Sequence, residues 1–218
     1  MPLHCVLCEA ASPKRPLCAG CHADLPHHLA PACPVCALPA LDGKACGACL
    51  RHPPAFDRTL AAFSYGFPID RLLHAFKYAS DLALAGVLAE PLARIAAGHP
   101  KPDLLLPMPL HPSRLRERGF NQALEIARPI SKWLGIPLAT DACRRTRDTP
   151  SQAGLKLKER RRNVRGAFAC DLGLAGKKVA VLDDVMTTGA TLNELSRILK
   201  SRGAAEVSAW VVARTLPE

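Results

Sequence analysis

Two adjacent carboxylates and a run of small hydroxyl side chains stand together in the stretch VLDDVMTTGAT, residues 181–191. The apolar start is typical of a buried strand, and Asp183 and Asp184 follow it directly, although neighbouring acids repel each other and add nothing to a core. The turn after them leads into a helix, whose first amides lack backbone partners. Amides and hydroxyls at a helix N-terminus form a phosphate cradle, so the stretch predicts a site for a phosphorylated sugar.

In the predicted site, the two acids and the turn would bind different groups of the sugar phosphate. Asp183 and Asp184 would accept hydrogen bonds from a ribose diol or hold Mg²⁺ at the ribose. The 5-phosphate would lie in the turn formed by Thr187, Thr188, Gly189, Ala190 and Thr191. An ordinary capping box, Thr191-x-x-Glu194, is the alternative, and it leaves the two aspartates unexplained.

Eight of the ten cysteines lie before residue 50, in four C-x-x-C pairs. The unit C-x2-C-x9-C-x2-C occurs twice, and each copy supplies the four thiolates of a closed zinc site. The ligands would be Cys5, Cys8, Cys18, Cys21, Cys33, Cys36, Cys46 and Cys49. Redox pairs and an iron–sulfur cluster are the alternatives, and sequential and cross-braced zinc ligation both remain open. Two structural zinc ions are the prediction; Cys143 and Cys170 are expected to be small buried residues.

The composition limits the classes of protein to which the chain can belong. The chain has 218 residues, 49% of them hydrophobic, which suits one ordinary domain plus a small module. The formal charge of +10 falls to about +6 once eight thiolates hold two zinc ions. No run of 18 apolar residues and no signal peptide is recognised, so we expect no membrane span and a cytoplasmic location with reduced cysteines.

Strands and helices alternate along the rest of the chain. Strands are expected at 59–65, 103–109, 177–184 and 206–214, and helical stretches at 69–98, 121–135 and 191–203. This order predicts an α/β fold with a parallel sheet flanked by helices. Ligands of such sheets bind at the carboxyl ends of the strands, which is where Asp183 and Asp184 stand.

The motif VLDDVMTTGAT resembles the phosphoribosyl pyrophosphate (PRPP) motif of type I phosphoribosyltransferases. Together with PLHPSRLRERGFNQA, RDTPSQAGLKLKERRRNVRGAF and the cysteine repeats, it resembles the ComF family over nearly the whole chain. The resemblance implies a double zinc ribbon at 1–54 and a phosphoribosyltransferase-like domain at 55–218. It also implies a link to natural transformation and to the use of external DNA, while enzymatic turnover does not follow from it.

In that fold, the segment after the second strand resembles a loop that binds pyrophosphate. The candidates are Leu110 and His111 through their backbone, and Arg114, Arg116 and Arg118 through guanidinium groups that suit phosphate oxygens. A solvated basic turn is the alternative. Mg²⁺ would accompany PRPP on its diphosphate.

Three further segments contain candidate functional residues. Residues 156–168 carry six basic side chains and one acid; they could form a lid over the substrate, a contact for nucleic acid or a solvated helix face. The TPSQ signature, residues 149–152, has no derived role. Lys77 and Tyr78 could reach the site, although Tyr78 could equally pack in the core.

Two classes of function remain. One is a PRPP-binding protein acting in DNA uptake, with single-stranded DNA and competence-machinery proteins as partners. The other is an active transferase that moves ribose 5-phosphate from PRPP to a nitrogenous base, for which neither an acid–base group nor the acceptor is identified. An aromatic content of 5% argues against a dedicated base-stacking surface. A PRPP-sensing regulator ranks last, because no helix-turn-helix is recognised. We favour PRPP binding and leave catalysis open.

Overall fold

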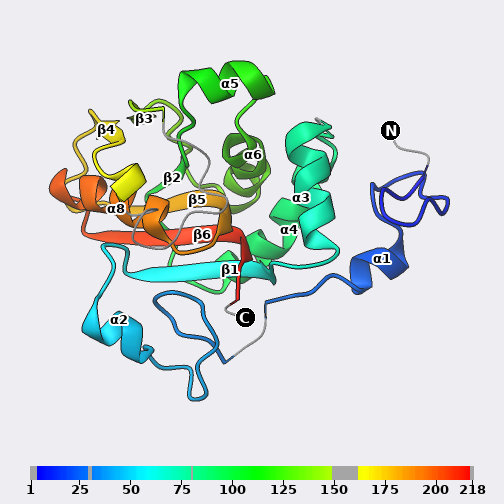
Figure 1. The fold of residues 1–218 in the computed structure, drawn as a ribbon, viewed down its shortest axis with the longest axis horizontal. Coiled ribbons are helices and arrows are strands. Elements are labelled where there is room, and N and C mark those ends of the chain that lie inside the picture. The colour runs from blue at the N-terminus through cyan, green and yellow to red at the C-terminus, as the bar shows by residue number, and fades with distance from the viewer. Residues whose placement is uncertain (1–3, 29–30, 80, 149–161, 217–218) are drawn as a thin grey trace.

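The computed structural model describes residues 4–28, 31–79, 81–148 and 162–216. Figure 1 shows two segments made mostly of loops at the start of the chain, followed by a sheet with its helices. Short helices α1 (Ala19–Ala23) and α2 (Gly47–Arg51) begin directly after Cys18 and Cys46. We call residues 4–23 the first ribbon and residues 33–51 the second ribbon.

A four-stranded parallel sheet forms the centre of the fold, as expected. Its order is β1 (Arg58–Ser64), β6 (Glu206–Arg214), β5 (Lys178–Met186) and β2 (Leu104–Pro107). The middle strands β5 and β6 are buried almost throughout, because both faces of the sheet are covered. All four carboxyl ends therefore lie at one edge of the sheet, with the end of β5 near its middle.

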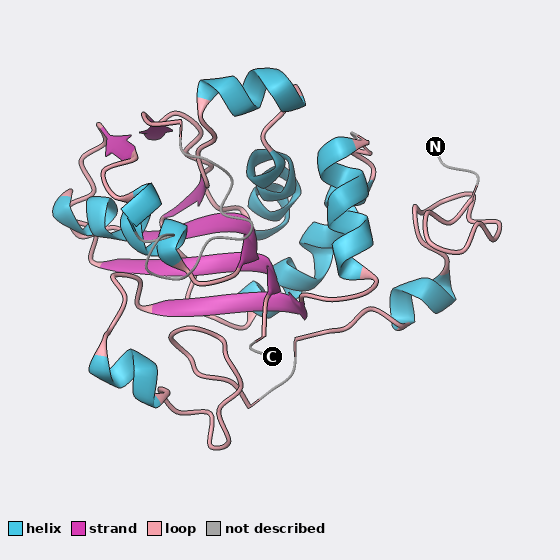
Figure 2. Ribbon diagram, in the orientation of Figure 1, coloured by secondary structure: helices cyan, strands magenta, loops and turns pink. Residues whose placement is uncertain are grey.

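Helices cover the two faces of the sheet (Figure 2). Helices α4 (Leu84–Ala97) and α6 (Gln122–Leu134) pack against each other and against the sheet. Helix α8 (Ala190–Ser201) connects β5 to β6, and the right-handed crossover rule puts it on the opposite face. The stretch expected to be helical over 69–98 divides into α3 (Ile69–Tyr78) and α4, with a turn in which the amide of Leu84 donates to the carbonyl of Asp81.

Residues 26–28, between the two ribbons, lie along the open edge of β1. The amide of His28 donates to the carbonyl of Ala62, and the amide of Ser64 donates to the carbonyl of Pro26. The amide of Thr59 donates to the carbonyl of Pro34. These contacts satisfy backbone groups that an edge strand would otherwise present to solvent.

Three short elements beside the site have no counterpart among the expected ones. Helix α5 spans Pro112–Arg118, and β3 (Cys143–Arg145) pairs in antiparallel fashion with β4 (Phe168–Cys170). Segments this short carry too few residues for a hydrophobic period to show. Cys143 and Cys170 are buried and directly opposite each other in this hairpin, in line with their expected role as small buried residues.

Among the described residues, no helix is long and apolar enough to cross a membrane.

Candidate functional site

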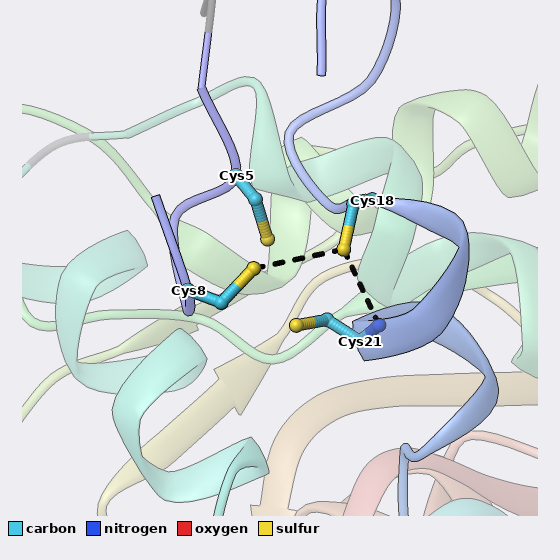
Figure 3. Close-up of side chains that lie close together, drawn as sticks. All are labelled: Cys5, Cys8, Cys18 and Cys21. Atoms are coloured by element: carbon cyan, nitrogen blue, oxygen red, sulfur yellow. Dashed lines mark hydrogen bonds between the residues drawn. The ribbon is translucent and has the colours of Figure 1, made fainter. Parts of the chain in front are cut away.

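Each ribbon gathers its own four thiols. Figure 3 shows Cys5, Cys8, Cys18 and Cys21 turned toward a common centre. Within each set of four, the sulfur atoms all lie within 4.8 Å of one another, and the Cys8–Cys18 and Cys36–Cys46 sulfur distances are both 3.7 Å. Sulfurs about 2.3 Å from a tetrahedral zinc would stand about 3.8 Å apart. Both sites are compatible with structural zinc, and the ligation is sequential rather than cross-braced.

The electrostatics of these thiol clusters favours a bound cation. Burial tends to raise the pKa of the Cys5 thiol, but the backbone amides of Cys18, Cys8 and Leu7 lower it to about 6. The pKa of Cys33 is lowered to about 7 in the same way. The neighbouring sulfurs then raise the pKa of Cys21, because additional negative charge accumulates in the cluster. A bound Zn²⁺ would remove this penalty and stabilise a segment with little apolar bulk.

At the end of β5, the adjacent aspartates differ in their surroundings. Asp184 is 5% exposed and forms an ion pair with the ammonium group of Lys77 on α3. Burial opposes ionisation of Asp184, but the charge of Lys77 keeps its pKa below the ordinary value. Burial and the charge of Asp184 raise the pKa of Asp183 well above the ordinary value. The pair therefore offers one carboxylate and one carboxyl that retains its proton more readily, a mixture that can accept and donate hydrogen bonds.

The turn after β5 has a backbone shape that needs glycine. Gly189 has φ +73°, and a Cβ added there would lie 2.7 Å from Cε of Met186 and 3.6 Å from the Phe56 ring. Gly189 is also the N-cap of α8, so Thr191 lies inside the first turn instead of capping it. Glu194, the other half of the expected capping box, accepts from the amide of Gly166. The capping-box alternative is therefore wrong.

One cavity of about 310 Å³ brings most of the predicted residues together. Its lining joins α3, the segment after β2, helix α5, strand β3 and the end of β5. Predicted residues in this lining are Lys77, Tyr78, Leu110, His111, Arg114, Arg118, Asp183, Asp184, Thr187 and Thr191. Gly189 and Ala190 line a small adjoining pocket, and together with Thr188 they also line a separate cavity of about 500 Å³ next to the second ribbon.

The three predicted arginines fall on two sides of α5. Arg114 and Arg118 stand four residues apart, hence on one helix face, and both line the cavity. Arg116 lies about half a turn away, is exposed and is not part of this lining. Arg118 also stacks over the ring of Tyr78 at 5.5 Å, which places that ring at the mouth of the cavity.

The cavity also contains residues that the sequence did not single out. Gln122, Arg145 and Asp148 line it together with the predicted set. The Arg145 guanidinium lies over the Phe168 ring at 5.6 Å, so the short β3–β4 hairpin carries this cation to the site. Asp148 precedes the TPSQ signature, and that adjacency was the one signal that pointed to it.

A small polar cluster closes one end of the cavity. The hydroxyl of Ser113 donates to Asp148 at 2.7 Å and lies 2.7 Å from Nδ1 of His111. Nδ1 of His111 is 3.7 Å from the Asp148 carboxylate. The Ser113 hydroxyl lowers the pKa of Asp148, which keeps this carboxylate charged beside the histidine.

Part of the basic segment and its neighbour lie outside the described residues. This applies to residues 149–152, the TPSQ signature, and to 156–161 of the proposed lid. Of the described remainder, Arg165 lines the cavity beside the second ribbon, and Phe168 is a buried residue of β4.

Comparison with known proteins agrees with this architecture. Residues 1–50 match the double zinc ribbon domain, and residues 121–216 match the phosphoribosyl transferase domain. DNA utilization protein YhgH of Escherichia coli O157:H7 is 37% identical over 191 residues, 84% of each chain. Competence protein F of Haemophilus influenzae is 32% identical over 220 residues, which cover 96% of this chain and 90% of that protein. Competence protein ComFC of Bacillus subtilis is 25% identical, over 98% of this chain and 95% of its own.

The fold has the parallel sheet and flanking helices of a type I phosphoribosyltransferase, preceded by two four-cysteine clusters. The similarity to Competence protein F extends through both parts. The chain therefore belongs to the ComF family, together with DNA utilization protein YhgH and Competence protein F.

Proposed function

We propose that the protein binds PRPP with Mg²⁺ in the cavity at the end of β5, and that it acts in DNA uptake or the use of external DNA. The observation that carries the first part is the gathering of an acid pair, a hydroxyl-rich turn and two arginines around one cavity of about 310 Å³. PRPP has three matching groups: a ribose diol, a 5-phosphate and a diphosphate.

Each group of the ligand is assigned to its own partners. The diol would lie on Asp183 and Asp184, which can accept and donate hydrogen bonds. The 5-phosphate would lie in the turn at 187–191, at the start of α8, where the positive end of the helix dipole favours an anion. The diphosphate, with Mg²⁺ on its oxygens, would face Arg114 and Arg118.

Lys77 has a defined part in this proposal. Its side chain is 19% exposed and neutralises Asp184 when the cavity holds no sugar. A buried carboxylate without a partner would be costly, so Lys77 keeps the acid pair in place until a diol or Mg²⁺ shares its charge.

The role in handling DNA rests on the relatives. DNA utilization protein YhgH and Competence protein F carry that function in their names. A formal charge of +10 suits a polyanionic partner such as single-stranded DNA, whose binding would weaken steeply with salt. Competence-machinery proteins would be further partners. We also propose zinc in both ribbons, a cytoplasmic location that keeps their thiols reduced, and a domain boundary between residues 54 and 55.

An active phosphoribosyltransferase is the second candidate, and the cluster of His111, Ser113 and Asp148 favours it. This cluster lies beside Arg114, where the diphosphate would leave, and could donate a proton there. Pyrophosphate release in the presence of purine and pyrimidine bases would establish turnover.

Calorimetric titration with Mg–PRPP tests the proposal. Wild-type protein should bind, and Asp183→Asn with Asp184→Asn should remove measurable binding. Arg118→Gln should weaken binding about tenfold or more, because a charge-assisted hydrogen bond contributes about 1.5–3 kcal/mol. Arg116→Gln is the matched control on the other side of α5 and should bind like wild type. Equal weakening by both arginine variants, or no binding to wild type, would refute the assignment.

Titration with a single-stranded oligonucleotide tests whether DNA binds at a site separate from PRPP. The double aspartate variant should retain wild-type affinity for the oligonucleotide, because the acid pair repels phosphate and contributes nothing to that contact. Loss of DNA binding along with PRPP binding would place both ligands in one site and contradict the division proposed here.

A further inference from the structure

Arg214, at the end of β6, joins the second ribbon to the turn that follows β5. It is 4% exposed. Its Nε donates to the carbonyl of Cys36 at 2.8 Å, and Nη1 donates to the carbonyls of Met186 at 2.9 Å and Thr215 at 2.8 Å. Nη1 also donates to the carbonyl of Thr187. One guanidinium thus bonds both a cysteine of the second ribbon and the start of the turn.

The charge of this arginine needs a partner. Within the described ranges, no carboxylate forms an ion pair with Arg214, and a buried cation without compensation is costly. The second ribbon supplies the missing charge, because four thiolates around one Zn²⁺ carry a net charge of about −2. The sulfur spacing in that ribbon fits zinc, as described above. The zinc centre and Arg214 are therefore complementary in charge as well as in hydrogen bonding.

These bonds fix the direction of the amides in the turn. A trans peptide unit is planar, and its N–H points opposite to its C=O. Because the carbonyls of Met186 and Thr187 point at Arg214, the amides of Thr187 and Thr188 point away from it. The Met186–Thr187 peptide is also held by backbone pairing of β5 with β6, because the amide of Thr215 donates to the carbonyl of Met186 at 3.1 Å. The added contribution of Arg214, which also bonds Cys36, is therefore to the Thr187–Thr188 peptide, where it orients the amide of Thr188.

Thr59 of β1 makes a second connection between the same two regions. Its hydroxyl donates to the carbonyl of Val35 at 2.6 Å and lies 4.0 Å from the sulfur of Met186. Residues that follow the second ribbon also contact this region: Phe56 packs near Gly189, and the amide of Ala55 donates to Asn193 of α8 at 2.7 Å. The turn and the start of α8 are therefore held both by the second ribbon and by the residues between it and β1.

We propose that Arg214 is a positioning residue through which zinc in the second ribbon and a phosphorylated ligand in the turn at 187–191 stabilise each other. The proposal rests on the proposed function and adds a form of regulation to it: loss of the second zinc loosens the phosphate site. Zinc in the first ribbon has no part in this coupling. Among the described residues, the hydrogen bonds of the first ribbon stay within residues 4–25.

Coupling between two ligands is reciprocal, so PRPP must protect the second zinc. The test measures zinc transfer from wild-type protein to a chromogenic chelator, with and without saturating Mg–PRPP. One of the two zinc ions should become harder to remove by about fivefold or more, the usual range for coupled sites. The other should be unaffected. A Cys5→Ser, Cys8→Ser protein, which retains only the second zinc, should show the full protection.

Arg214→Lys supplies the specific control. Lysine keeps the positive charge but cannot donate to Cys36 and to the turn at the same time, so the protection should disappear while zinc still binds. PRPP binding without protection of either zinc, or with equal protection of both, would overturn the proposal. Persistence of the protection in Arg214→Lys would remove Arg214 from it. Failure of wild-type protein to bind PRPP in calorimetry would instead refute the proposed function.

Discussion

The two ribbons have identical cysteine spacing but different relations to the core. The first ribbon meets the core through apolar packing: Leu17 is 2% exposed, and residues of the ribbon line a groove of about 230 Å³ together with Val87 and Trp133. The second ribbon is hydrogen-bonded to β1 and β6 through Thr59 and Arg214. A four-cysteine cluster of the same spacing can thus be an appendage in one place and be hydrogen-bonded to the central sheet in another. Directed polar contacts, not the ligand spacing, make the difference.

Removal of metal ligands should show the largest contrast. Cys33→Ser with Cys36→Ser should lower the unfolding temperature of the core by roughly 10 °C or more, because buried links worth about 1–3 kcal/mol each are lost with the zinc. Cys5→Ser with Cys8→Ser should release one zinc and leave the main unfolding transition nearly unchanged. Calorimetric melting and metal analysis of both proteins check this. Equal destabilisation by the two pairs would eliminate the contrast between the ribbons.

The turn that the second ribbon supports should be sensitive at Gly189. Gly189→Ala places a side chain at φ +73° against Met186 and Phe56, which costs about 1–2 kcal/mol and should weaken PRPP binding and retention of the second zinc. Gly135→Ala, at φ +61° in the C-cap of α6, should cost similar stability without either effect. Zinc release and PRPP titration of both variants distinguish strain that affects only local stability from strain that also weakens PRPP binding and zinc retention.

The pH dependence of stability should arise from groups in the core, and it should be unchanged when the first ribbon loses its zinc. The pKa of Asp183 is raised, so its stabilising contribution is full below about pH 3.9 and is lost as pH rises through the raised value. Asp183→Asn should therefore raise the unfolding temperature at pH 7. The lowered pKa of Asp184 means the reverse: its contribution is present above about pH 3.9 and is lost as pH falls.

Asp184→Asn should accordingly lower the unfolding temperature at pH 7, because Lys77 is then buried without its partner. Each shift should be a few degrees, at about 2–4 °C for each kcal/mol. Melting curves from pH 3 to pH 8 of both variants, with and without the first-ribbon cysteines, test the assignment. Shifts of the same sign in the two variants would contradict it.

Single hydroxyl deletions should show the smallest contrast. Thr59→Val leaves the carbonyl of Val35 without its donor, which should cost about 1–3 kcal/mol and slightly weaken retention of the second zinc. Ser12→Ala removes the bond to the carbonyl of Arg15 within the first ribbon and should affect only the first zinc. Zinc titration of the two variants tests this contrast. An effect of Thr59→Val on the first zinc and of Ser12→Ala on the second would contradict it.

The sequence predicted those features that depend on local spacing. The thiols of each ribbon follow from the repeat, the strand expected at 206–214 coincides with β6, and the acids do stand at the end of a parallel strand. These features follow from residue type and from periodicity along the chain, and neither depends on contacts with distant residues.

Features that depend on through-space contacts escaped prediction. Arg214 meets Cys36 across 178 positions, and Arg145 reaches the cavity on a three-residue strand with no readable period. The sequence could have predicted that Arg116 lies apart from Arg114 and Arg118. Pro112 is a favourable first residue of a helix, and in a helix Arg114 and Arg118, four positions apart, share one face. Reading that stretch as a loop hid the distinction.

A crystal structure of the protein with Mg–PRPP tests the assignment of the site most directly. We expect the 5-phosphate within hydrogen-bonding distance of the amides at 188–191 and the ribose diol on Asp183 and Asp184, with the diphosphate toward Arg118. Intact ligand in the crystal together with an empty cavity at the end of β5, or PRPP bound elsewhere on the molecule, would contradict the assignment.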